Sequence, residues 1–300
     1  MCADSLLDSL NIDILMKKLE EELYVADREI ATALFLAIKM RKPLLIEGEP
    51  GCGKTEIAKV LAKILGTELI RLQCYEGLEV SDAIYEWNYP RQLLYIKMVE
   101  NRKEPKDVEE EIFSEKYLLK RPLLKALLSD CEVPPVLLID EVDRADEEFE
   151  GFLLEFLAEY QITIPEIGTI KAKNQPIVIL TSNRTREIGD GLKRRCLYLY
   201  ISYPSMEKEL KILKMKVKSI DDSVAEKIVS FVNLIRQRND ILKKPGVAET
   251  LDWAKALTEL GAKEFNKEIV KSTLLCIIKT QEDISRIDVE SMLNMLSSGA

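Results

Sequence analysis

Histidine is absent from this sequence of 300 residues. Its absence excludes histidine general bases, serine–histidine triads and histidine-ligated metals. The six cysteines are scattered and form no Cys-x-x-Cys pair, so we expect reduced thiols and no zinc site. Any chemistry must therefore run on carboxylates, lysine, arginine, hydroxyls or thiols.

Long apolar runs and an excess of positive charge are also missing. No apolar run approaches the roughly 18 residues that a membrane span needs. The first residues carry Asp4 and Asp8 and no basic cluster before an apolar block, so we expect no secretory signal and a cytoplasmic location. A net charge of −9 and a pI near 5.0 argue against general electrostatic binding of nucleic acid, although a local basic strip is not excluded.

The segment 48–55 reads Gly-Glu-Pro-Gly-Cys-Gly-Lys-Thr and matches the phosphate-loop pattern G-x-x-x-x-G-K-[ST] in full. An apolar run precedes it and the helix-like segment Glu56–Leu65 follows, which is the context that this loop requires. The alternative is a glycine-rich turn that caps an ordinary helix, and the flanking strand and helix patterns favour the phosphate loop. We expect a nucleoside triphosphate to contact Gly48, Glu49, Pro50, Gly51, Cys52, Gly53, Lys54, Thr55 and Glu56.

The chemistry of the loop follows from its residue types. Glycines let backbone N–H groups turn inward around phosphate oxygens, and the following helix adds the positive end of its dipole. Lys54 would reach the β- and γ-phosphates, and the Thr55 hydroxyl would take one coordination position on Mg²⁺. ATP and Mg²⁺ are therefore the expected ligands.

Short β-rich apolar runs recur between helical patterns. Strands that alternate with helices indicate a parallel sheet with helices on both faces, an α/β fold. Two helix-like stretches, Leu6–Leu23 and Asp27–Met40, come first, and Asp27 is placed to cap the second. The predicted strands are Pro43–Glu47, Glu68–Leu72, Val136–Asp140, Ile177–Ser182 and Leu197–Ser202.

The strand pattern ends near Pro204, and the remaining residues show the apolar spacing of helices. With 47% hydrophobic and 32% charged residues, a chain of this length fits a globular protein of two moderate domains. We therefore predict an α/β core with N-terminal helices at 1–204 and a small all-helical domain at 205–300.

Three segments interrupt the alternation of strands and helices. For Tyr75–Arg91, a surface loop anchored by Trp87 and an insertion that contacts a substrate or partner are equally favoured. The charged run Glu100–Glu111 predicts a mobile, solvated loop. Residues Gln161–Ala172 contain two alternating pieces around a Pro/Gly turn and predict a β-hairpin.

The third predicted strand ends in two acids, Asp140 and Glu141. Parallel strands deliver their carboxyl ends to one edge of a sheet, so these acids should lie near the phosphate loop. Asp140 would then hold Mg²⁺ through water or Thr55, and Glu141 would polarise the attacking water. Asn183 follows the fourth strand and fits a polar contact to the same site or a turn-forming asparagine.

These motifs together resemble an AAA+ ATPase, and specifically the MoxR family. Gly48–Thr55 match its Walker A, Leu137–Glu141 its Walker B, Ile162–Ala172 its pre-sensor-1 insertion and Thr181–Asn183 its sensor-1 strand end. The resemblance implies a five-stranded parallel sheet in a three-layer α/β/α core, a helical lid, and a ring-shaped homo-oligomer, with a hexamer expected. It also implies that the Asn183 amide contacts the γ-phosphate or the lytic water.

The segment Gly191–Leu197 occupies the place of the family's arginine finger, with Arg194 as the better match and Arg195 as the second choice. Many relatives present an arginine from the lid to the nucleotide, but here Glu249 stands near that position. A carboxylate near phosphate would be repulsive, so we expect Glu249 to cap its helix or to face another subunit.

A narrower resemblance concerns the branch that accompanies carbon monoxide dehydrogenase maturation. The segments Arg71–Leu78, Tyr85–Leu94 and Leu192–Tyr198 are similar to that branch. It implies a von Willebrand factor A-domain partner, a metalloenzyme client such as a molybdenum hydroxylase, and remodelling of that client.

Two other functions fit the same motifs. A nucleotide-controlled scaffold or switch would bind ATP with little turnover. A DNA-acting AAA+ protein, such as a clamp loader or branch-migration motor, is disfavoured by the acidic pI and the lack of an obvious basic strip.

Overall fold

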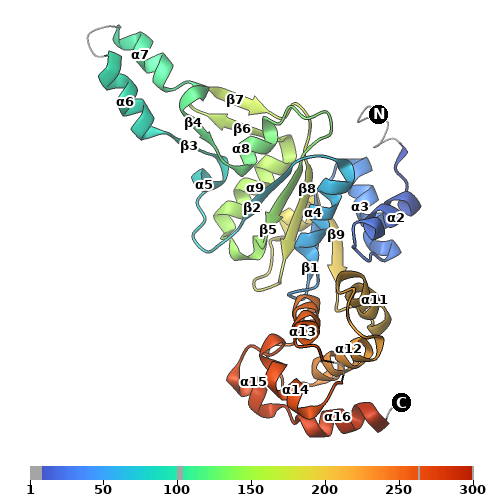
Figure 1. The fold of residues 1–300 in the computed structure, drawn as a ribbon. Helices are drawn as coiled ribbons and strands as arrows, with labels where there is room; N and C mark the ends of the chain where they lie inside the picture. Colours follow the sequence, from blue (N-terminus) through green and yellow to red (C-terminus); the bar gives the residue numbers. More distant parts are fainter. Residues whose placement is uncertain (1–8, 100–103, 263, 299–300) are drawn as a thin grey trace. The chain divides into compact units, whose positions relative to one another are not determined.

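The computed structural model describes residues 9–99, 104–262 and 264–298 (Figure 1). The chain divides into two compact units. The first comprises residues 1–16, 28–47 and 55–199, and the second comprises residues 17–27, 48–54 and 200–300. Within the described ranges, no helix combines the length and apolar character needed to cross a membrane.

A five-stranded sheet forms the centre of the fold, in the order β2-β5-β8-β1-β9. The strand pairs β2·β5, β5·β8 and β8·β1 are parallel. The predicted five-stranded parallel sheet is therefore confirmed, and each strand lies within one residue of its expected bounds. The strands are β1 (Leu44–Gly48), β2 (Leu69–Gln73), β5 (Val136–Asp140), β8 (Ile177–Ser182) and β9 (Leu197–Ile201).

Position in the sheet explains the two kinds of strand sequence. The three inner strands β1, β5 and β8 are buried at every residue, whereas the edge strands β2 and β9 alternate between buried and more exposed residues. A parallel strand that is covered by helices on both faces needs apolar side chains at successive positions. The continuous apolar runs of the sequence are therefore the inner strands.

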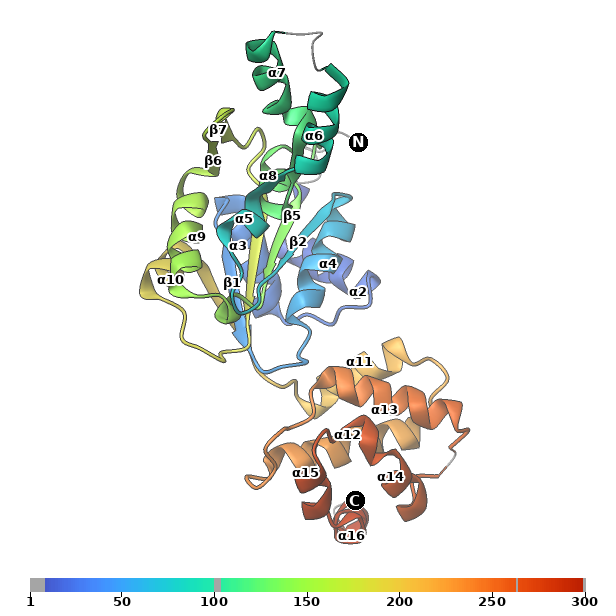
Figure 2. The same ribbon diagram turned by 90° about the vertical axis from the view of Figure 1, so that its left-hand side faces the viewer.

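Helices cover both faces of the sheet (Figure 2). Leu137 and Ile139 of β5 pack in one buried cluster with α8 (Pro122–Leu127) and α9 (Glu147–Glu159). Side chains alternate along a strand, so the intervening Leu138 points to the opposite face. The helices α2 (Ile12–Glu21), α3 (Arg28–Met40), α4 (Lys54–Leu65) and α10 (Asp190–Arg195) complete this part of the chain.

An insertion of short elements follows β2 and projects from the sheet (Figures 1 and 2). The strand β3 pairs antiparallel with β4, and Trp87 of β3 is buried against Tyr85 and Phe113. The anchoring role predicted for Trp87 is confirmed. The prediction of an irregular surface loop is wrong, because these residues form helices and a strand. The elements are α5 (Val80–Ile84), β3 (Tyr85–Trp87), α6 (Tyr89–Val99), α7 (Pro105–Ile112), a 3₁₀ turn η1 (Glu115–Tyr117) and β4 (Leu118–Lys120).

The charged run after α6 was expected to be a mobile loop. Its first residues, 100–103, lie outside the described part of the chain, and residues 105–112 form α7, so the expectation is wrong for α7. Val108 and Ile112 lie one helical turn apart and are half-buried, and Asp107 in the first turn suits the helix dipole. The charged side chains of residues 106–111 therefore belong to a helix and not to a loop.

The predicted β-hairpin is confirmed. Strand β6 (Gln161–Ile164) pairs antiparallel with β7 (Gly168–Lys171), and the hydroxyls of Thr163 and Thr169 lie 3.0 Å apart across the pair. Ile162 and Ile164 are buried, so one side of the hairpin is anchored in the core.

The residues after 200 form helices packed around a separate apolar cluster that includes Phe231, Trp253 and Phe265. The predicted change from strands to helices is confirmed, while the domain boundary at residue 204 stays a prediction. The helices are α11 (Met206–Lys216), α12 (Asp222–Gln237), α13 (Val247–Glu259), α14 (Lys267–Thr273), η3 (Leu274–Cys276), α15 (Gln281–Arg286) and α16 (Val289–Ser298).

Candidate functional site

The phosphate-loop motif connects β1 to α4, as the sequence predicted. Gly51 and Gly53 adopt φ values of +73° and +85°, a backbone conformation that L side chains rarely take. The Lys54 Nζ atom is buried in the loop and donates to the carbonyl oxygens of Gly48 and Glu49, at 2.9 and 2.7 Å. The loop therefore has the conformation and the central ammonium group of an anion cradle.

Asp140 is the last residue of β5, and both oxygens of its carboxyl group have hydrogen-bond partners. Its Oδ1 atom accepts hydrogen bonds from the hydroxyls of Thr55 at 2.9 Å and Thr181 at 2.5 Å. Its Oδ2 atom faces the Arg71 guanidinium, with distances of 3.0 Å to Nε and 2.5 Å to Nη2. Since Asp140 is only 2% exposed, these contacts compensate for the burial of its carboxyl group.

Glu141 turns away from Asp140 because its backbone is left-handed, with φ 55° and ψ 49°. Its N–H donates to the Thr181 hydroxyl oxygen at 2.9 Å. Its Oε1 atom accepts from the Asn183 amide at 3.1 Å. Its Oε2 atom lies 2.7 Å from Arg144 Nε and accepts from Gln73 Nε2 at 3.2 Å.

The sequence identified Asp140, Glu141, Asn183 and Thr55 as a group, and the structure brings these four side chains together. It also adds residues that sequence reasoning missed: Arg71 and Gln73 on β2, Arg144 after β5, and Thr181 on β8. The register explains the β2 pair, because Gln73 lies directly opposite Asp140. Their position at the carboxyl end of another predicted strand was the signal available in the sequence.

Burial sets the protonation of two thiols, Cys74 after β2 and Cys52 in the phosphate loop. Burial and, to a smaller extent, the nearby Asp140 carboxylate together raise the pKa of Cys74 to about 12. Burial likewise raises the pKa of Cys52, in the phosphate loop, to about 11, although Lys54 opposes the shift. Both groups are therefore neutral thiols near pH 7 and are poor nucleophiles there.

The phosphate loop and the start of α13 belong to the same compact unit. The Ala248 N–H donates to the Gly51 carbonyl at 3.2 Å. Glu249 accepts a hydrogen bond from the Gly246 N–H at 3.0 Å and so caps α13, which confirms the predicted capping role.

A buried lid arginine was not foreseen from the sequence. The guanidinium of Arg236 on α12 donates two hydrogen bonds to the Glu209 carboxylate, at 2.5 and 2.8 Å. Its Cζ atom lies 4.6 Å from the centre of the Tyr203 ring. Its charge lowers the pKa of Cys52, although burial dominates that shift. In the second unit, the cation near the phosphate loop is therefore Arg236 of α12, whereas the position of Glu249 carries no cation.

Arg194 and Arg195 are exposed and lie at the end of α10. The hydrogen bonds and ion pairs of Asp140 and Glu141 described above are made by residues other than these two arginines. The two arginines thus remain at the surface, where another molecule can reach them.

The residues present fit a magnesium nucleotide. Mg²⁺ takes oxygen ligands in proteins, and the Thr55 hydroxyl and the Asp140 carboxyl place two such oxygens 2.9 Å apart. Glu56, at the start of α4, lies 3.4 Å from Lys59 on its own helix. Its charge is therefore directed along the helix surface, and its expected nucleotide contact stays a prediction.

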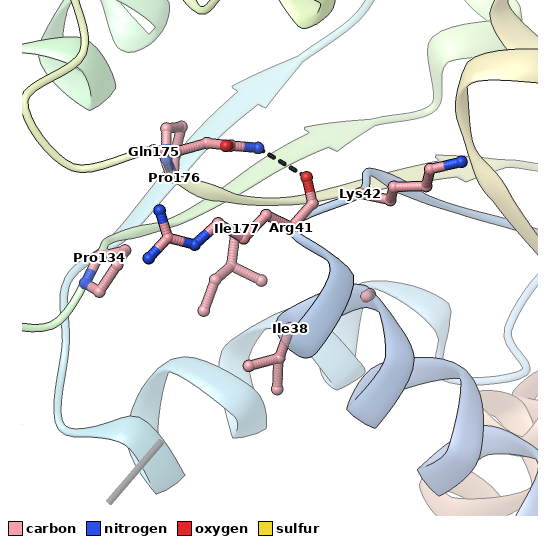
Figure 3. Close-up of a pocket in the computed structure, with 8 residues that line it drawn as sticks. Ile38, Arg41, Lys42, Pro134, Gln175, Pro176 and Ile177 are labelled. Atoms are coloured by element: carbon pink, nitrogen blue, oxygen red, sulfur yellow. Dashed lines mark hydrogen bonds between the residues drawn. The ribbon is translucent and has the colours of Figure 1, made fainter. Parts of the chain in front are cut away.

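A small hollow lies at the opposite ends of the strands, where Lys42, Pro134 and Pro176 precede β1, β5 and β8 (Figure 3). Gln175 spans one side of it by donating to the Arg41 carbonyl at 2.7 Å. Its volume of about 40 Å³ is far below the roughly 300 Å³ of the smallest usual ligand pockets. The phosphate-loop end of the sheet is therefore the better candidate site.

One family model and several known proteins match this chain. A family model described as "AAA domain (dynein-related subfamily)" matches residues 43–196, which include the loop, both acids, Asn183 and the two arginines. The chain is similar to the uncharacterized protein YeaC of Bacillus subtilis, with 24% identity over 75% of this chain and 64% of YeaC.

Two RuvB proteins are also similar to this chain. The Holliday junction branch migration complex subunit RuvB of Pseudothermotoga lettingae is 23% identical over 90% of this chain and 75% of its own length. The solved structure of the Thermotoga maritima RuvB branch migration motor aligns over 93% of this chain and 75% of its own, with 18% identity and a TM-score of 0.46.

Proposed function

This chain belongs to the dynein-related subfamily of AAA domains and is an ATPase, and we propose that it acts as one subunit of a ring that remodels a client protein. The family model spans about half of the chain. The observation that carries the proposed site is the meeting of Thr55 with Asp140 and of Asn183 with Glu141 at one edge of the sheet. We expect the ring to be a hexamer.

Each residue has a separate role in this proposal. The loop N–H groups and Lys54 would bind the phosphates, and Thr55 and Asp140 would hold Mg²⁺. When bound, the metal would supply positive charge that offsets the charge of the phosphates. Glu141 orients and polarises the attacking water, and Asn183 keeps the Glu141 carboxyl in place through the 3.1 Å contact.

Turnover and binding of two variants test these roles. Glu141→Gln should bind ATP with nearly unchanged affinity and lose at least about 100-fold in turnover, because the amide cannot polarise water. Lys54→Ala should lose nucleotide binding, hydrolysis or both. Full turnover in Lys54→Ala, or failure of Glu141→Gln to bind ATP, would contradict the assignments.

The proposed client is a metalloenzyme, with a von Willebrand factor A-domain protein as partner. The support is the resemblance of Arg71–Leu78, Tyr85–Leu94 and Leu192–Tyr198 to the MoxR branch associated with carbon monoxide dehydrogenase maturation. In the structure the first of these segments holds Arg71 and Gln73, which contact Asp140 and Glu141. One of the segments that carry this resemblance thus contributes two residues to the proposed site.

A trap experiment tests the client proposal. Glu141→Gln in ATP should retain partner proteins that the Lys54→Ala control releases, and purified partner should change the ATPase rate of the unmodified chain. If ATP alters assembly while turnover stays negligible with and without partner, the chain is a nucleotide-controlled switch instead.

A DNA motor is the second candidate, and the similarity to RuvB over 90% of the chain favours it. The net charge of −9 opposes it, because phosphate binding relies on an excess of basic groups. Salt-dependent binding of duplex or branched DNA together with DNA-stimulated hydrolysis would support the motor. No stimulation at low salt would exclude it.

A further inference from the structure

Asp143 is a buried acid that neither the metal site nor the attack on phosphate uses. It lies in the 3₁₀ turn η2 (Val142–Arg144), and its side chain is almost fully enclosed, with the residue 2% exposed. Its Oδ1 atom accepts the Asn183 N–H at 3.2 Å. Its Oδ2 atom accepts the N–H and the hydroxyl of Thr185, at 2.8 and 2.6 Å. All three donors belong to one short segment.

That segment has an unfavourable backbone at its middle residue. Arg184 has φ +59°, and a left-handed residue with a side chain costs about 1–2 kcal/mol. Asp143 bonds the residues on both sides of it, and the Ser182 hydroxyl oxygen accepts the Arg184 N–H at 3.0 Å. The turn is therefore held in place by its neighbours and would relax to other conformations without them.

The same segment carries the Asn183 amide. The backbone N–H of Asn183 is bonded to Asp143, while its side-chain Nδ2 atom is bonded to Glu141 Oε1 at 3.1 Å. The position of the Asn183 side-chain amide depends on the position of the Asn183 backbone. Because Asp143 holds that backbone in place, it also sets where the amide meets Glu141. An error of about 1 Å in such a position can lower a rate about 100-fold.

We propose that Asp143 is a positioning residue for ATP hydrolysis, which clamps the turn 183–185 so that Asn183 holds Glu141 in its working orientation. The inference rests on the proposed roles of Asn183 and Glu141. It assigns to Asp143 no contact with nucleotide, metal or water.

Steady-state kinetics of Asp143→Ala provide the first test. We expect kcat to fall about 100-fold while KM for ATP changes less than about 3-fold, because the phosphate loop is untouched. Asp143→Asn keeps one acceptor oxygen and should recover part of the lost kcat. A raised KM with unchanged kcat, or no difference between the alanine and asparagine variants, would overturn the proposal.

A double-variant cycle separates positioning from general structural damage. If Asp143 acts through Asn183, then Asp143→Ala/Asn183→Ala should turn over within about 3-fold of Asn183→Ala alone. Independent roles would multiply the two losses and would overturn the proposal.

The controls keep this inference distinct from the proposed function. If Asn183→Ala and Glu141→Gln keep normal turnover, the proposed site itself fails. If both lose turnover while Asp143→Ala retains it, only the role of Asp143 fails.

Should Asp143→Ala not fold, Thr185→Val gives a milder test, because it removes the hydroxyl donor and keeps the side-chain shape. We expect a loss of several-fold in kcat with an unchanged KM and an unchanged near-UV circular dichroism spectrum. Normal turnover of both Thr185→Val and Asp143→Asn would overturn the proposal.

Discussion

Asp140 and Glu141 are neighbours in the chain, yet their surroundings differ completely. Two hydroxyls and a guanidinium surround the Asp140 carboxyl, whereas the Glu141 carboxyl meets the amide of Asn183 and the guanidinium of Arg144. The left-handed backbone at Glu141 produces this divergence, because it turns the chain sharply at the end of β5. One dipeptide can thus serve two tasks in the same site.

Thiol reactivity tests the electrostatics of the phosphate loop. Burial raises the Cys52 pKa to about 11 from a usual value near 9, so its thiolate fraction is lower at any given pH. Only the thiolate reacts with iodoacetamide. We expect Cys52 labelling to accelerate about 10-fold per pH unit from 8 and to level off only near 11.

Cys131 is the matched control, because it is exposed. At pH 8 it should label well before Cys52, as followed by peptide mass spectrometry. Equal rates for the two cysteines would show that the loop thiol is not held in a buried, neutral form.

The sequence alone identified the residues that form local motifs, and it missed those that depend on contact between distant strands. Lys54, Asp140 and Glu141 stand in recognisable patterns. Arg71 reaches Asp140 only because β2 and β5 pair in one particular register, which no local pattern specifies. Asp143 followed the acidic pair within the same motif, but its donors lie about 40 residues further along the chain.

The exposed face of α6 allows a prediction about a single element. Leu93 and Leu94 are each 60% exposed, whereas Gln92 is 5% exposed and donates to the Ile112 carbonyl at 2.6 Å. Leu93→Gln and Leu94→Gln should each change the free energy of unfolding by less than about 0.5 kcal/mol, since glutamine has a similar helix propensity.

Gln92→Ala on the same helix is the contrasting variant. It leaves the Ile112 carbonyl without its donor, so we expect a loss of about 1–2 kcal/mol. Urea unfolding compares the three variants. If the leucine variants destabilise more than Gln92→Ala, the leucines are packed rather than exposed.

Elements of the sheet were predictable because inner parallel strands combine apolar runs with flanking turns. The insertion α5–β4 was not, for a physical reason. Its strands are three residues long, and their pairing joins Tyr85 to Lys120 across two helices. Alternation over three residues carries almost no signal, and the acids of α7 resemble a solvated loop until the half-buried Val108 and Ile112 are recognised as one stripe.

At the scale of the whole molecule, the exposure of Arg194 and Arg195 at the end of α10 fits the proposal that a neighbouring subunit completes the site. Arg194 and Arg195 end a helix within the region matched by the AAA family model, and in the described part of the chain the contacts given for Asp140 and Glu141 come from other residues. A finger supplied by a neighbouring subunit contributes about 10³–10⁵ in rate in related phosphoryl-transfer sites. Activity should therefore depend on assembly and fall steeply on dilution.

Mixing two inactive variants tests this directly. Arg194→Ala keeps an intact phosphate loop, and Lys54→Ala keeps an intact finger, so a mixed ring regains a complete site wherever the two meet in the correct order. Random mixing at a 1:1 ratio puts this arrangement at roughly one quarter of the interfaces of a closed ring. The mixture should then recover up to about one quarter of the unmodified activity, whereas each variant alone stays inactive. Recovery with Arg195→Ala in place of Arg194→Ala would assign the finger to Arg195, and no recovery with either would place both arginines outside the reaction.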